Sequence, residues 1–449
     1  MRVLSLLTIV FSLVGCQVTT SGPEGEVVAI PPGKADNYLS PVVQEYDVEG
    51  QVLVKLSDDV PLEERDKQAA KLATQMMDRL TRGLSSKLKE LSPEDQHGKD
   101  AVIVYLRRAS VTTDQLTAQE GGGYSFLYKA EVAGTSNLLP FSDGTRAQVL
   151  ELGEGEERQS VTLQFAPSVA VKDTYPRYRE LFKDGLEIYI HYGGDYNDSR
   201  WDIKKSTAMF DKLKAMGLTP PTESYDEFKL DSGPFVGQLD AGGEQVQVRV
   251  TMVHPEMVGD DELQQLVDAY KQHARAADVV IYAGHASEDT GYSGVVVHYN
   301  PRKALPASEF KSLDLPDRYQ IFVFSGCYTY TGYADQLLQN PKKSTDNVDV
   351  VTAVSSTPLS RDIVSALLGG LVDQSADTWY PRTWREVLQR VNDESERAWR
   401  GGFGVHGLES NPTSSGPSQK FLPSWVWIEV KAEVFVEVSD DLGERADER

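Results

Sequence analysis

The sequence predicts an α/β domain, a mostly parallel sheet covered by helices on both faces, preceded by a smaller β-rich α+β domain. Three observations lead to this prediction. The length of 449 residues is about three times that of a usual domain. Residues 182–400 alternate amphipathic helices with strands that are apolar on both faces, which is typical of a covered parallel sheet. Residues 45–170 instead contain strands, with one long helix between the first two.

The first residues show a pattern typical of an exported protein. A short basic start, an almost unbroken apolar run over residues 3–14 and small residues precede Cys16. This arrangement resembles the bacterial lipobox, whose cysteine becomes the first mature residue and carries lipid. Residues 1–16 are therefore expected to be a lipoprotein signal, with an ordinary secretory signal as the alternative. Gln17 favours the outer membrane of the cell envelope, and residues 17–44 are expected to be a flexible tether.

Charge and hydropathy narrow the range of partners. The chain carries 45 Lys and Arg against 68 Asp and Glu, a formal net charge of -23. Such a charge repels phosphate backbones and anionic membrane surfaces, so nucleic-acid binding is not expected. No interior apolar run has the roughly eighteen residues that a membrane span needs. Membrane attachment is therefore expected only through the lipid anchor.

The region 45–170 is predicted to form the small α+β domain. Leucine and methionine recur at every fourth position from Leu72 to Leu88, which places them on one stripe of a helix that ends before Pro93. Strands are expected around it at residues 51–56, 101–106, 126–132 and 160–165. No residue pattern in this region indicates catalysis.

The region 182–400 is predicted to form the α/β domain. Its strands are expected at residues 186–190, 246–253, 278–283, 320–324 and 348–354, with amphipathic or apolar helices between and after them. In sheets of this kind, active sites lie at the carboxyl ends of the strands. The last part, 401–449, is expected to contain a loop rich in Gly, Ser and Pro, a half-buried strand at 425–438 and a disordered charged tail.

A cysteine and a histidine stand directly after two of these strands. If Cys16 is lipidated, Cys327 is the only thiol of the mature chain. The strand 279–283 runs into His285, and the strand 320–324 runs into Cys327. A nucleophilic thiol needs a nearby group that exchanges its proton, and two strand ends of one parallel sheet bring an imidazole and a sulfur to the same edge. A buried structural cysteine is the alternative.

The matching stretches, residues 279–285 and 321–327, together resemble the caspase-like superfamily of cysteine peptidases, which includes caspases, legumains, clostripain and gingipains. The resemblance covers most of the predicted α/β domain. It implies that Cys327 is the nucleophile, that His285 is its catalytic partner, and that the backbone N–H groups of Ala286 and Cys327 form the oxyanion hole. It also implies a protein or peptide substrate and no cofactor.

Two positions near these residues differ from the family pattern. Relatives commonly carry Gly after the histidine, whereas this chain has Ala286, whose methyl group is tolerable only at negative φ. Ser325 stands two positions before the cysteine, where several relatives carry an acidic or amide residue of the specificity pocket. Acidic loop residues that could take that place in the pocket, or be solvated loop carboxylates, are Asp195, Asp198, Glu288 and Asp289.

These observations predict a cell-envelope cysteine endopeptidase that cleaves extracytoplasmic proteins through an acyl-enzyme. The alternative is a catalytically inactive caspase-like binding lipoprotein, because a fold does not establish an activity. A third alternative is an intermolecular disulfide through Cys327. The spacing of the histidines matches no metal-binding motif, so no metal is expected.

Overall fold

The computed structural model of the chain describes residues 37–57, 59–91, 104–111, 117–119, 123–134, 147–152, 159–168, 171–241, 243–286, 294–330, 332–372, 379–395 and 401–413. The expected signal with Cys16, the residues Glu288 and Asp289, and the expected last strand and charged tail lie outside these ranges. Across the described residues, no helix combines the length and the apolarity that crossing a membrane requires.

The larger part of the structure is an α/β domain with an eight-stranded sheet in the order β1-β16-β15-β14-β11-β8-β10-β9. The five central strands are parallel: β15 (Val348–Ala353), β14 (Gln320–Ser325), β11 (Val279–Ala283), β8 (Leu186–Tyr192) and β10 (Gln245–Val253). The outer strands pair antiparallel with their neighbours: β9 (Phe235–Asp240), β16 (Phe403–His406) and β1 (Tyr38–Leu39). The predicted α/β class is therefore confirmed, with a mixed sheet.

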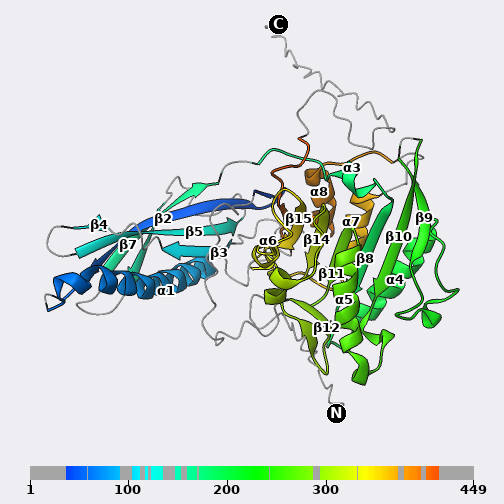
Figure 1. Ribbon diagram of the computed structural model, residues 1–449, viewed down its shortest axis with the longest axis horizontal. Helices are drawn as coiled ribbons and strands as arrows, with labels where there is room; N and C mark the ends of the chain where they lie inside the picture. Colours follow the sequence, from blue (N-terminus) through cyan, green and yellow to red (C-terminus); the bar gives the residue numbers. More distant parts are fainter. Residues whose placement is uncertain are drawn as a thin grey trace, which may run out of the picture.

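Helices cover both faces of this sheet (Figure 1). One hydrophobic cluster joins the sheet to α3 (Tyr178–Leu181), α4 (Trp201–Ala215), α7 (Ile363–Leu371) and α8 (Trp384–Glu394), and a second joins it to α5 (Gln264–Ala276) and α6 (Tyr333–Leu338). Because side chains alternate along a strand, Ile188 and Ile190 of β8 belong to the first cluster and Tyr189 to the second. This double burial explains why the strands are apolar on both faces.

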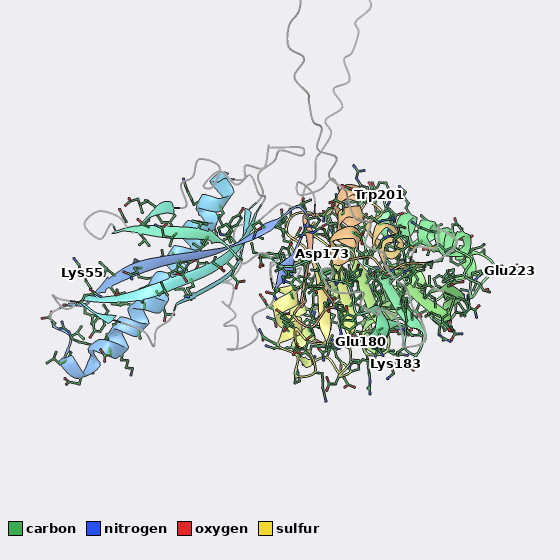
Figure 2. The ribbon with its side chains drawn as sticks, turned by 90° about the horizontal axis from the view of Figure 1, so that it is seen from above. Lys55, Asp173, Glu180, Lys183, Trp201 and Glu223 are labelled. Carbon is green, nitrogen blue, oxygen red and sulfur yellow. The ribbon has the colours of Figure 1, made fainter. Side chains whose placement is uncertain are left out.

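A second sheet is formed by residues 44–167, and we call this part the α+β unit. Its strands are β2 (Gln44–Lys55), β3 (Val104–Val111), β4 (Thr117–Ala118), β5 (Gly123–Gly134), β6 (Ala147–Leu152) and β7 (Gln159–Pro167), in the order β3-β5-β2-β7-β6 with β4 beside β5. The helix α1 (Arg65–Leu91) buries Leu80 and Leu84 against this sheet. β2 runs from the α/β domain to Lys55 at the far end of the unit (Figure 2).

Residues 37–44 are the described part of the expected tether, and they include a short strand. Residues 38 and 39 form β1, which pairs with β16 at the edge of the main sheet. Strands of two and four residues are too short to show the alternation of polar and apolar side chains that identifies a strand. β16 also contains a glycine, so its residues were expected to belong to the loop that begins at residue 401. The hairpin of β12 (Val295–His298) and β13 (Lys303–Leu305) was not expected either.

The α+β unit is an insertion in the chain of the α/β domain. Only four residues separate β1 of the main sheet from β2 of the unit. The chain leaves the unit beside the point where it starts, because Ser168 N donates to the carbonyl of Glu45 at 2.9 Å. A two-strand stem therefore connects the two parts (Figure 1).

Candidate active site

Three turns meet at the carboxyl edge of the main sheet. The last residues of three adjacent strands, Tyr192, Ala283 and Ser325, are in register. β8 leads to Asp195, β11 to His285 and β14 to Cys327. The sheet topology thus brings all three side chains to one edge, as expected for a site in a parallel sheet.

Glycines allow these turns to approach each other closely. A Cβ at Gly193 would lie 2.6 Å from the carbonyl oxygen of Val296, and one at Gly326 would lie 2.5 Å from Cβ of Ala286. Real Cβ atoms do not reach such distances, so only glycine fits without a shift. Gly326 therefore packs directly on Ala286. Because His285 precedes Ala286 and Cys327 follows Gly326, the imidazole and the thiol come from two segments in contact.

A buried tyrosine fixes the turn that carries the histidine. The hydroxyl of Tyr282 donates to the carbonyl of His285 at 2.6 Å and accepts from Val296 N at 3.1 Å. The segment after β11 is thereby tied to β12, and Tyr282 itself is fully buried. The position of His285 is set by a side chain that the sequence analysis did not single out.

The histidine pairs with an aspartate from the neighbouring strand end. Nε2 of His285 lies 3.1 Å from Oδ1 of Asp195. The ring also lies against Tyr196, with centroids 4.7 Å apart. Because Nε2 is engaged by the carboxylate, Nδ1 is the nitrogen left for proton exchange; it has no hydrogen-bond partner among the described residues. Asp195, expected as a pocket residue or a solvated loop carboxylate, lies buried beside His285 in the structure.

The environment of Asp195 keeps its carboxylate charged. Burial by itself raises the pKa of this carboxyl, but hydrogen bonds from His285, Asn197 and Trp201 outweigh burial and lower the pKa to about 2. Asn197 donates from its backbone and side chain, at 3.1 and 2.8 Å, and the backbone of Trp201 donates at 3.0 Å. Trp201 begins α4 at the rim of the α/β domain (Figure 2). A charged, immobile acceptor therefore faces the imidazole.

The thiol of Cys327 is buried and held by a residue that follows β15. Its exposed fraction is 6%. Sγ accepts from Thr357 N at 3.4 Å and can donate to the Thr357 carbonyl at 3.8 Å. Thr357 Oγ1 also donates to the carbonyl of Gly326 at 3.1 Å. A backbone N–H next to sulfur favours the thiolate form.

The residue after Cys327 has a strained backbone. Tyr328 has φ 57°, in the left-handed region. This conformation costs roughly 1–2 kcal/mol for a residue with a side chain, and it persists only where surrounding contacts hold it. Among the described residues, Ala286 is not one of the non-glycine residues with positive φ. Its φ therefore lies in the range in which the methyl group is tolerable.

A small cleft opens to solvent beside these turns. Ser325, expected in the substrate pocket, lies on its wall, as do Thr357 and Tyr192. The Tyr192 hydroxyl is buried and has no partner among the described residues. Burial, and then the negative charge of Asp362, raise the pKa of Tyr192. Asp198 is exposed and does not line the cleft.

Comparison with known proteins gave no relative: no protein family, no curated protein and no solved structure matches this chain. The described ranges contain no cluster of His, Cys, Asp and Glu that could hold a metal ion. Cys327, His285 and Asp195 are therefore the residues whose geometry bears on function.

Proposed function

We propose that this protein is a caspase-like cysteine endopeptidase that cleaves proteins outside the cytoplasm. Cys327 is the nucleophile, His285 exchanges its proton, and Asp195 orients the histidine. The observation that supports this most is the 3.1 Å contact of His285 Nε2 with a buried carboxylate, on a turn that packs against the turn carrying the thiol. A carboxylate that orients an imidazole, next to a thiol whose proton the imidazole can take, is the arrangement of a catalytic triad.

The reaction would proceed in two steps. Nδ1 of His285 takes the thiol proton, and the thiolate of Cys327 attacks the scissile carbonyl carbon. The N–H groups of Ala286 and Cys327 face the oxygen that becomes negative. The imidazolium then gives its proton to the leaving amine, and water, deprotonated by His285, hydrolyses the thioester. Throughout, the charged Asp195 stabilises the imidazolium.

The cleft beside Ser325 would receive the substrate side chain next to the scissile bond. Thr357 connects the cleft with the thiol of Cys327, because it lines the cleft and its N–H donates to the sulfur. The unpartnered hydroxyl of Tyr192 is a cost to the fold, since burying it without a bond loses its interaction with water. A polar substrate group that bonds to it would remove that cost, and we therefore assign Tyr192 to substrate binding.

Replacing Tyr192 with phenylalanine is expected to raise KM by about five- to tenfold for peptides with a polar side chain at this position, the equivalent of one hydrogen bond. The free energy of unfolding should stay the same or rise by about 1 kcal/mol, because an unsatisfied group is removed. Steady-state kinetics on a peptide panel and denaturant unfolding measure both. Tyr189→Phe is the matched control: its hydroxyl bonds to His191 Nδ1 at 2.7 Å, so that variant should lose stability and keep KM. An unchanged KM for every peptide in Tyr192→Phe would remove Tyr192 from the binding site.

Chemical titration of the thiol tests the proposed function. The purified mature protein is incubated with a peptide library, and parallel samples are first treated with increasing iodoacetamide. We expect cleavage to fall in proportion to the fraction of Cys327 alkylated, as measured by peptide mass. Cleavage that survives complete alkylation contradicts the proposal. A folded protein that cleaves no peptide and alkylates at the rate of an ordinary cysteine would instead be a binding lipoprotein.

We also propose that the protein is anchored to the cell envelope through lipid on Cys16, most simply in the outer membrane. The apolar run and the small residues before this cysteine support the proposal. Radiolabelled palmitate should enter the wild-type protein in a bacterial host and be absent from Cys16→Ser. Equal labelling of the two proteins, or none of either, contradicts the anchor.

A further inference from the structure

The α+β unit contacts the α/β domain at the segment that follows Cys327. A small buried cluster joins the two parts, and we call it the docking cluster: Tyr38, Val43, Ala133, Tyr330 and Val354. Ala133 comes from β5 of the unit, and Tyr330 comes from the turn after β14. The Tyr330 hydroxyl donates to Oε1 of Glu45, at the start of β2, at 2.7 Å. The side chain of Tyr330 is fully buried.

Both segments that hold the thiol end in this cluster. Tyr330 follows Cys327 by three positions, and Val354 precedes Thr357, the donor to the sulfur, by three. The two segments are tied to each other, because Tyr330 N donates to the Ala353 carbonyl at 2.9 Å and Tyr328 N donates to the Ser355 carbonyl at 3.2 Å. A displacement of Tyr330 therefore acts on the segment that carries the sulfur and on the segment that carries its donor.

The cluster also supplies the contacts that a strained turn needs. Tyr328, with its positive φ, lies between Cys327 and Tyr330. Such a residue relaxes unless the chain on both sides is fixed. Cys327 is fixed by the contact of Gly326 with Ala286, and Tyr330 is fixed by the docking cluster. The ring of Tyr330 is packed edge-on against Tyr38, with centroids 5.2 Å apart.

We propose that Glu45 and Tyr330 are positioning residues for Cys327, so that docking of the α+β unit sets the alignment of the nucleophile. This inference rests on the proposed peptidase function for its role in catalysis. The unit then has a part in the reaction although none of its described residues lines the cleft.

Full-length variants test this positioning. Tyr330→Phe and Glu45→Ala are expected to lower kcat and the rate of Cys327 alkylation by about five- to tenfold, the factor for one hydrogen bond. KM should stay within about twofold, because neither residue lines the cleft. The pH midpoint of alkylation should move upward, since the Thr357 N–H donor to the thiolate is misaligned. Glu45→Gln keeps an oxygen acceptor for Tyr330 and should behave like the wild type.

Matched controls lie in the same unit, away from the cluster. Tyr124 donates to Asp66 at 3.0 Å, and Glu49, on the same strand as Glu45, forms an exposed ion pair with Lys129 at 2.9 Å. Tyr124→Phe and Glu49→Ala should keep wild-type rates. Wild-type rates in Tyr330→Phe and Glu45→Ala would overturn the inference, as would equal losses in the controls or in Glu45→Gln.

The readouts separate this inference from the proposed function. Alkylation is measured without substrate, so it tests positioning in a protein that cleaves nothing. Cleavage by the wild type that disappears in Cys327→Ala, together with unaffected Tyr330→Phe and Glu45→Ala, would retain the function and overturn the positioning role.

Discussion

Replacing His285 with alanine is expected to lower kcat/KM by about 10⁴-fold or more, and Cys327→Ala should abolish cleavage. Without the imidazole, the thiol has no proton acceptor and the leaving amine has no donor. The dependence of Cys327 alkylation on pH should also differ from that of the wild type, because the imidazole no longer exchanges the thiol proton. Initial rates on a cleaved peptide and alkylation over a pH series measure the two effects.

His298 provides the matched control for this prediction. Its side chain has an exposed fraction of 15%, against 13% for His285, and its Nδ1 contacts the Pro301 carbonyl at 2.8 Å rather than an acid at the site. His298→Ala should therefore keep kcat/KM within a few-fold of the wild type. Similar losses in His285→Ala and His298→Ala would indicate general destabilisation and contradict the role of His285 as a base.

The second large effect is expected for Asp195→Asn, which should lower kcat by about 10²–10⁴-fold. The carboxylate only accepts hydrogen bonds, so it holds the proton of neutral His285 on Nε2 and leaves the lone pair of Nδ1 for the thiol. An asparagine amide can donate to Nε2 instead, which moves the proton to Nδ1. The imidazole then has the wrong tautomer for its reaction with Cys327.

The pH dependence of kcat/KM tests the charge state of this aspartate. The pKa of Asp195 is about 2, below its ordinary value of 3.8, so its contribution to folding is present above pH 3.8 and is lost as the pH falls through 2. Asp195 therefore stays charged between pH 4 and 7, and kcat/KM should show no titration of this carboxyl in that range. Asp198→Asn, on an exposed side chain of the same loop, should keep wild-type kcat. If Asp195→Asn also kept kcat within twofold, the orienting role would be refuted.

The sequence predicts the parts of the site that depend on single strands. His285 and Cys327 follow apolar strands, and a strand end in a parallel sheet is identified by its own pattern of side chains. The α/β class follows from the same periodicity, and the helix α1 follows from its stripe of leucines. These features need only local information.

The remaining parts depend on which strands are neighbours. Asp195 reaches His285 because β8 lies beside β11, and strand order is a property of the packed sheet. Thr357 contacts the sulfur because its loop folds back over β14, 30 positions after Cys327. The pair of glycines at positions 193 and 194, directly before Asp195, is the one local signal of a tight approach there.

The pairing of β1 with β16 determines when the edge of the main sheet can form during synthesis and folding. The Tyr38 hydroxyl bonds to the Gly402 carbonyl at 3.5 Å, across 364 positions of the chain. Synthesis proceeds from the N-terminus, so Tyr38 is present long before its partner strand β16. Contacts between such distant segments form late in folding. Because Tyr38 also packs on Tyr330, this support of the segment after Cys327 is complete only once β16 has joined the sheet, and a growing chain that still lacks β16 also lacks the support.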